Sequence, residues 1–401
     1  MKRYKRGILL AATKDSAFAI GSQLVNIIDK MGGFVDVFYI VNEGFDDDDK
    51  KAMKKIATEI KFISFTQEDF LNKLSVFVKS KDELFFQNLS FLNRYTHMSY
   101  ALFEGLNLLD ECEKILYLDF DILLLKSIKE LFTYEFDLCV DRGKSSLSFL
   151  CPHLSCEFAT EKAFRSGIVC FSSLIKDPKA CYEFIYESSA KYNFINDQIA
   201  LSLLIYSQKL RVKILKRSKY AGELFYRQNR SASIIHAYGR NNRFWNNKLA
   251  NTLFPQWNEC YKKWLSFGGS AYTGGFVAKT TYVVQRFRFH LAYKLGLAMI
   301  RAAKTRLGIL TCPLSLSLIF LRHRLEQRLY KKECLKKPYL RLPLLKDYDD
   351  YAACKEKESM PYKLGEGLIK AFKNWHRGDL IKFFFELKRL RKDYEKGLNF
   401  K

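Results

Sequence analysis

The chain has 401 residues, of which 48% are hydrophobic, so it is long enough for a sizeable core and is globular rather than disordered. Its net charge of +24 is unevenly distributed, because residues 271–401 carry 29 Lys and Arg against 12 Asp and Glu. The positive and negative charges of the front part therefore nearly balance, whereas the back part is strongly basic. We expect the partner of the back part to be an anionic surface.

Strand and helix patterns alternate along the front part of the chain. Apolar runs predict strands at 7–13, 34–41, 61–65, 115–118, 135–140, 166–172 and 233–237. Helices are predicted at 16–30, from 46 onward, and at 95–109, 178–192 and 196–207. This order predicts a mainly parallel, doubly wound α/β sheet, in which the loops that follow the strands meet at one edge.

The most informative motif is Asp119-Phe120-Asp121, directly after the apolar run 115–118. Side chains two residues apart on a strand point to the same side, so the two carboxylates are expected to converge where the strand leaves the sheet. Two like charges held together favour a bound cation, and oxygen ligands suit Mg²⁺ or Mn²⁺. By itself the pair fits a solvated pair of charges equally well.

Five segments, in this order along residues 7–245, resemble the retaining glycosyltransferases of family 8. They are Ala12-Thr13-Lys14-Asp15 with Phe18; the strand before Asp119 and Asp121; AFRSGIVCFS, which contains Ser166 and Gly167; Asp197-Gln198 at a helix start; and IIHAYGRNNRFW with Trp245, which contains His236 and Gly239. The chain departs from the family pattern at Phe18, Leu102, Arg165 and Arg243.

The resemblance implies a GT-A type mixed sheet, a UDP-sugar donor, and Mn²⁺ or Mg²⁺ held by Asp119, Asp121 and His236. It places Gln198 and Asp197 at the reacting centre. It also implies that residues of the matched segments contact the donor: Ala12, Thr13, Asp15, Phe18, Phe120, Ser166, Gly167, Gly239, and Arg243 or Arg240. Simpler roles stay open: His236 and Phe18 as core residues, Arg243 as a surface arginine, and Asp197 as a helix cap.

The back part carries two basic amphipathic segments and one apolar segment. Residues 280–306 place Arg286, His290, Lys294, Arg301 and Lys304 on one predicted helical face. The apolar segment 308–321 is interrupted by Pro313 and is too short to span a bilayer, and 380–398 is basic again. We expect residues 1–265 to form the transferase domain. We expect 266–401 to form a basic, mainly helical region for membrane association or oligomerisation, the alternative being a helical subdomain that packs on the transferase domain.

The sequence shows no export signal, and its ten cysteines have no disulfide or zinc spacing, which favours a reducing cytoplasm. With the resemblance, this predicts transfer of galactose or glucose to a lipid-linked bacterial glycan, such as a lipopolysaccharide or lipooligosaccharide core or a capsule precursor. The enzyme would work at the inner face of the cytoplasmic membrane. Nucleic acid is not an expected partner. The alternatives are a nucleotidyltransferase, or a non-catalytic membrane- or nucleic-acid-binding protein with a degenerate transferase domain.

Overall fold

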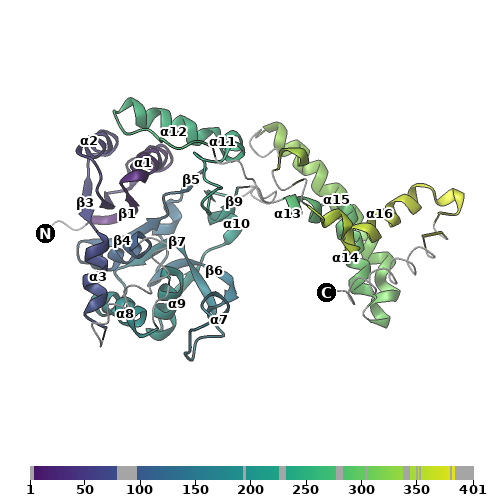
Figure 1. Ribbon diagram of the computed structural model, residues 1–401, viewed down its shortest axis with the longest axis horizontal. Helices are drawn as coiled ribbons and strands as arrows, with labels where there is room; N and C mark the ends of the chain where they lie inside the picture. Colours follow the sequence, from purple (N-terminus) through teal and green to yellow (C-terminus); the bar gives the residue numbers. More distant parts are fainter. Residues whose placement is uncertain are drawn as a thin grey trace. The chain divides into compact units, whose positions relative to one another are not determined.

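The structure is a computed structural model that describes residues 4–78, 97–192, 196–224, 232–276, 283–303, 305–336, 344–348, 351, 354–379 and 382–383. The chain forms two compact units (Figure 1). The N-terminal unit consists of Met1–Asn246 and Phe254–Gly275, and the C-terminal unit of Asn247–Leu253 and Phe276–Lys401. The predicted domains, 1–265 and 266–401, divide the chain about ten residues earlier.

A seven-stranded sheet forms the centre of the N-terminal unit, with the strand order β3-β2-β1-β4-β7-β6-β8. Its strands are β1 (Tyr4–Thr13), β2 (Val37–Glu43), β3 (Ile60–Ser64), β4 (Cys112–Leu118), β6 (Leu138–Ser146), β7 (Lys162–Ser172) and β8 (Val212–Ile214). β7 runs antiparallel to both of its neighbours, and the other pairs are parallel. The sheet is therefore mixed, with one reversed strand, as the α/β prediction of a GT-A type sheet requires.

Helices cover both faces of this sheet (Figure 1). One face carries α1 (Ala17–Met31), α2 (Asp47–Ile56) and α12 (Pro255–Ser266), and the other carries α3 (Gln67–Ser75), α8 (Pro178–Lys191) and α9 (Asp197–Ser207). A glycine allows α12 to approach α1, because a Cβ at Gly21 would lie 2.2 Å from the ring of the fully buried Trp264. Burial on both faces explains the nearly continuous apolar sequences of β1 and β4.

A second, small sheet extends from the end of β4. It has the order β5-β10-β9, with β5 (Ile122–Leu124), β9 (Gly222–Glu223) and β10 (Ile234–His236). β10 pairs antiparallel with β5 and places His236 opposite Ile122. A strand more than one hundred residues later in the sequence is thereby fixed beside the Asp-x-Asp turn.

The segment predicted as a helix at 95–109 is helical where it is described, but mostly as 3₁₀ helix. Residues 95 and 96 lie outside the described residues, and the rest forms the 3₁₀ helices His97–Phe103 and Leu108–Asp110 around α6 (Glu104–Asn107). The four consecutive residues from Tyr100 to Phe103 are all buried, so tertiary packing rather than an amphipathic period sets the path of this segment. Two further short helices of the unit are α7 (Leu147–Leu150) and α10 (Arg217–Tyr220).

The C-terminal unit is helical, with α14 packed against α15 and α16. Its helices are α11 (Lys248–Leu253), α13 (Val283–Arg288), α14 (Leu291–Ala302), α15 (Arg306–Lys336) and α16 (Met360–Lys373). Two glycines let α14 and α16 touch through their backbones, since a Cβ at Gly365 would lie 1.7 Å from the carbonyl oxygen of Ala292. No helix of the described chain is long and apolar enough to cross a membrane.

The predicted basic face at 280–306 does not lie on one helix, and residues 280–282 and Lys304 of the prediction lie outside the described residues. The helix α13 ends at Arg288, and His290 stands at the N-cap position of α14. The Nδ1 atom of His290 lies 3.0 Å from the hydroxyl of Tyr362, and Lys294 forms an ion pair with Glu326 at 2.9 Å. Partners distant in sequence thus draw these basic side chains into the unit. The apolar segment 308–321 belongs to α15, which continues through Pro313, and the basic segment 380–398 lies outside the described residues except for 382–383.

Candidate metal centre and adjoining cavity

Asp119 and Asp121 lie on the turn that joins β4 to β5. The backbone of Asp119 is fixed on three sides: its N–H donates to the carbonyl oxygen of Gly167 (3.0 Å), and its carbonyl oxygen accepts from the Gln23 side chain (2.8 Å) and from the N–H of Ile122 (3.3 Å). The strand ends at Leu118, so the carboxylates converge across a turn and not along a strand. The predicted convergence is present, but the predicted reason for it was wrong.

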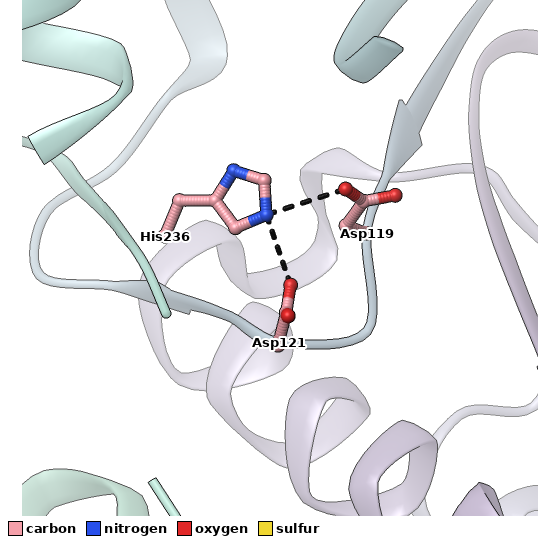
Figure 2. A group of neighbouring side chains, drawn as sticks. All are labelled: Asp119, Asp121 and His236. Atoms are coloured by element: carbon pink, nitrogen blue, oxygen red, sulfur yellow. Dashed lines mark ion pairs between the residues drawn. The ribbon is translucent and has the colours of Figure 1, made fainter. Parts of the chain in front are cut away.

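His236 completes a cluster with the two carboxylates. Its Nε2 atom lies 3.2 Å from Oδ2 of Asp119 and 2.9 Å from Oδ1 of Asp121, as Figure 2 shows. The N–H of Ala237 donates to the carbonyl oxygen of Asp121 at 2.9 Å, which fixes the end of β10 against the turn. The hydroxyl of Tyr117 donates to the other oxygen of Asp119 at 2.8 Å and so leaves Oδ2 facing the imidazole.

The three side chains are unequally exposed, and the charges around them change the ionisation of Asp121 and His236. The side chain of Asp121 is 8% exposed, that of His236 18% and that of Asp119 32%. Burial disfavours the charge on Asp121, but the charges of His236 and Arg243 outweigh burial and hold the pKa of Asp121 below its ordinary value. Burial also opposes a charged imidazole, yet Asp121 and Asp119 raise the pKa of His236 to about 10.

Gly167 makes the space in which this cluster sits. A Cβ on this residue would lie 2.5 Å from Cε1 of His236 and 2.6 Å from Oδ2 of Asp119, both closer than real contacts allow. A residue with a side chain would therefore displace one of the two groups. This close approach gives a physical reason for the glycine that the resemblance had only assigned to donor binding.

The cluster has the composition and spacing of a divalent-metal site. One ligand atom from each of Asp119, Asp121 and His236 lies within 4.8 Å of the others. Ligands about 2.1 Å from an octahedral ion lie about 3 Å apart, which is close to the two observed separations from the imidazole nitrogen. Two carboxylates and one imidazole suit Mn²⁺ or Mg²⁺ and leave positions for a substrate. In the described part of the chain, this is the one cluster of this kind.

Arg243 lies against the buried carboxylate of the cluster. Its Nε is 3.6 Å from Oδ2 of Asp121, and its guanidinium lies over the rings of Phe120 (4.5 Å) and Trp245 (5.5 Å). The loop that carries it turns at Gly239, which has φ of +102°. The buried Asn246 holds this loop by accepting from the N–H of Arg243 and donating to the carbonyl oxygen of Arg240. Arg243 is therefore next to the cluster, whereas Arg240 is exposed.

A cavity of about 330 Å³ opens beside the cluster. Among its lining residues are Asp119, Ser166, Gly167, Gln198 and His236, so it unites residues from four of the five motif segments. The predicted Gln198 thus faces the same space as the candidate metal ligands. The lining residues on β6, such as Asp141 and Lys144, lie outside the motifs and were not expected.

Asp197 begins α9 but does not cap it. The side chain of Asn196 accepts from the N–H of Ile199 and is the helix cap, so the capping alternative for Asp197 is wrong. Burial, with a further contribution from Asp119, raises the pKa of Asp197 to about 7, although a hydrogen bond from Ser166 acts in the opposite direction. The carboxyl group therefore gains or loses its proton near neutral pH.

The residues after β1 reach the same edge of the sheet. β1 is parallel to β4 with Leu9 opposite Tyr117, so both strands run on toward this edge. Ala12 is buried, Thr13 half-buried and Asp15 exposed. Phe18 is only 3% exposed and packs against the rings of Trp245 (5.4 Å) and Tyr272 (5.0 Å). Neighbouring rings enclose Phe18, so it has the core role that the sequence left open and does not face the donor side of the site. Leu102, another position where the chain departs from the family pattern, is fully buried.

One comparison with known proteins gives the class of this chain. The model of the family described as Glycosyl transferase family 8 matches residues 7–209, which is half of the chain. A second model, described as a domain of unknown function (DUF8374), matches residues 206–396, a range that includes His236. No curated protein matches the sequence significantly.

Solved structures with a similar fold include several glycosyltransferases. The galactosyltransferase LgtC, in complex with donor and acceptor sugar analogs, is 14% identical; the match covers 64% of this chain and 95% of that chain, with a TM-score of 0.48. The glycosyltransferase GlyE of Streptococcus pneumoniae TIGR4 is 14% identical, with 69% and 67% covered and a TM-score of 0.42. The bifunctional WbbM is 11% identical, with 65% and 52% covered and a TM-score of 0.46.

Proposed function

The chain belongs to glycosyl transferase family 8, and from this premise we propose that it transfers a hexose, galactose or glucose, from a UDP-sugar to a lipid-linked bacterial glycan. The observation that carries the proposal is the cluster of Asp119, Asp121 and His236, with Gly167 leaving the space beside it. Family membership argues against the nucleotidyltransferase alternative.

The cluster would hold Mn²⁺ or Mg²⁺. The ion would act as a Lewis acid toward the diphosphate of the leaving UDP. Tyr117 and the backbone bonds of Asp119 keep the ligand carboxylate oriented, while β10 positions the imidazole. Arg243, whose guanidinium lies beside Asp121, is the cation available to a diphosphate at this cluster.

The transfer breaks the bond from the anomeric carbon to the diphosphate oxygen, which leaves with the bonding electron pair. A new bond forms to an acceptor hydroxyl oxygen, whose proton passes to the departing diphosphate or to water. Gln198 lines the cavity where this exchange would take place. Its amide is a poor nucleophile, so we propose that it stabilises charge while the acceptor attacks from the leaving-group face, with retention of configuration. Asp197 and Ser166 would bind sugar hydroxyls beside it.

The first strand would hold the nucleoside. Ala12 and Thr13 can offer backbone groups, and the exposed carboxylate of Asp15 can accept hydrogen bonds from ribose or uracil. Phe18 would stabilise the position of this segment by packing against Trp245 and Tyr272.

The C-terminal unit would hold the enzyme at the inner face of the cytoplasmic membrane. Seven exposed leucines lie three or four residues apart along α15: Leu307, Leu310, Leu314, Leu318, Leu321, Leu325 and Leu329. At 100° per residue they fall within one helical face of about 100°. The opposite side packs inward through Leu316 and Ile319, and exposed arginines follow at 322, 324 and 328. Such a stripe flanked by cations supports adsorption to an anionic bilayer; a second copy of the chain is the alternative occupant.

A UDP-release screen of the full chain tests the proposed reaction. It would pair a panel of nucleotide sugars with a truncated lipooligosaccharide acceptor in the presence of Mn²⁺. We expect release from UDP-galactose or UDP-glucose, and a loss of about a hundredfold or more in the Asp121→Asn variant. The matched control is Asp48→Asn, which neutralises an exposed carboxylate on α2. Turnover of no UDP-sugar would contradict the proposal and favour the degenerate-domain alternative.

A further inference from the structure

The cavity beside the metal cluster contains two cationic side chains that the reaction itself does not use. Arg165 on β7 and Lys144 on β6 both line it. Arg165 is also a position where the chain departs from the family pattern. Two positive charges at this place favour a substrate group that is negatively charged.

The placement of Arg165 depends on an irregularity between two strands. Val140 pairs with Val169 and Arg142 with Phe164, so one residue of β6, Asp141, stands opposite four residues of β7 (165–168). A bulge of this kind bends the strand and changes the direction of its side chains. The irregular stretch also contains Ser166 and Gly167, so it shapes the cavity wall and the metal cluster together.

Asp141 holds one side of the Arg165 guanidinium. The Asp141 side chain is 7% exposed, and its Oδ2 lies 3.5 Å from Nε of Arg165. Burial raises the pKa of Asp141 despite the nearby charges of Arg165 and Arg217. A carboxylate on Nε leaves the two terminal nitrogens of Arg165 for another acceptor, and the Arg165 side chain is 34% exposed.

The cavity lining has two carboxylates and two cationic side chains, but the carboxylates do not occupy all the donors of the cations. Its two carboxylates are already engaged, Asp119 by the metal cluster and Asp141 by Arg165. Lys144 is exposed and forms no ion pair within the described residues. The terminal nitrogens of Arg165 and the ammonium group of Lys144 are the groups that a ligand can use. A neutral sugar would leave Lys144 without a charged partner and the terminal nitrogens of Arg165 without a charged acceptor, whereas a carboxylate or phosphate would accept from both.

We propose that this cavity binds a sugar that carries a carboxylate or phosphate group, and that Arg165 and Lys144 bind that group. The inference rests on the proposed transferase function and adds a substrate class to it. The anionic sugar is either the terminal residue of the acceptor or the sugar of the donor, because both must meet beside the metal cluster. Neither source changes the chemistry of recognition.

Matched substrate pairs test the proposal and separate the two sources. The acceptor arm compares a β-galacturonide with the β-galactoside of the same aglycone, using whichever UDP-hexose serves the wild-type chain as donor. The donor arm compares UDP-galacturonate with UDP-galactose. In one arm we expect the wild type to prefer the anionic member in kcat/KM, and Arg165→Gln to reduce that preference by about tenfold to a hundredfold.

Two further variants guard against a purely structural effect of Arg165→Gln. Lys144→Gln changes an exposed residue, so it should fold normally and still reduce the preference severalfold. Arg142→Gln lies on the same strand but pairs with Glu161 and does not line the cavity, so it should leave the preference unchanged. Equal use of charged and neutral members in both arms, or a preference that survives both cavity variants, would overturn the inference. A wild-type chain with no metal-dependent UDP release at all would instead contradict the proposed function.

Discussion

Gly167 faces His236 so closely that a Cβ on the glycine would lie 2.5 Å from Cε1 of the imidazole. The two residues come from β7 and β10, which belong to different sheets. Their approach joins the reversed strand of the large sheet to the strand that supplies the third candidate metal ligand. The site therefore depends on the packing of two sheets as much as on the Asp-x-Asp turn.

Replacing Gly167 with alanine should weaken Mn²⁺ binding by at least about tenfold, because the new methyl group would displace His236 or Asp119. Isothermal titration with Mn²⁺ measures this. Gly33→Ala is the matched control, since a Cβ there meets no atom within 4 Å and the residue has a negative φ of −75°. Unchanged Mn²⁺ affinity in Gly167→Ala would show that the cluster is not the metal site.

Metal binding should release a proton from His236. In the metal-free protein the two aspartates raise the pKa of His236 to about 10, so the imidazole is charged at pH 7 and must become neutral to bind a metal. Mn²⁺ affinity should fall up to about tenfold for each unit by which the pH is lowered below 8. Titrations in buffers of different ionisation enthalpy should show about one proton released. A binding enthalpy that is independent of the buffer would contradict this role for His236.

Asp197 should reduce stability at alkaline pH. Burial raises its pKa from 3.8 to about 7, so folding favours the protonated form. The stabilising contribution of that form is complete below about pH 4 and is lost as the pH rises through about 7. Asp197→Asn should therefore gain about 1–2 kcal/mol relative to the wild type between pH 5 and pH 8. Urea unfolding in EDTA measures the difference, and an equal effect at both pH values would refute it.

The leucine face of α15 should bind anionic membranes. Replacing Leu310, Leu314 and Leu318 with glutamate should reduce flotation with vesicles of phosphatidylglycerol and phosphatidylcholine by about tenfold or more. A charge-matched control places glutamates at Thr311, Ser315 and Ser317 on the same helix, where the added charges are the same and the leucines remain. Equal loss in both variants would point to electrostatics alone. A wild-type dimer that the leucine variant abolishes, without any vesicle binding, would assign the face to a second copy.

Much of the candidate site could be predicted because its motifs are local in sequence. Asp119 and Asp121 follow a buried strand, and the Asp197-Gln198 pair begins a helix, as expected. The reason that Gly167 is needed could not be predicted, because it depends on how close β7 lies to His236. The roles of Tyr117 and Gln23 depend in the same way on contacts across the fold.

The remaining differences have long-range causes. The bulge that places Asp141 beside Arg165 depends on the register between β6 and β7, which no local pattern records. The basic residues of 280–306 were predicted to form one helical face, but Lys294 pairs with Glu326 and His290 contacts Tyr362 inside the unit. Phe18 matches an aromatic position of the family, but the rings that pack around it make it a core residue.

Metal-dependent turnover of a UDP-sugar by the wild-type chain tests the central claim most directly. UDP release from UDP-galactose and UDP-glucose would be followed with Mn²⁺ present, after EDTA is added, and after Mn²⁺ is restored in excess. We predict that release stops on chelation and returns with the metal. Release that continues unchanged in EDTA would contradict the assignment of Asp119, Asp121 and His236 as a catalytic metal centre.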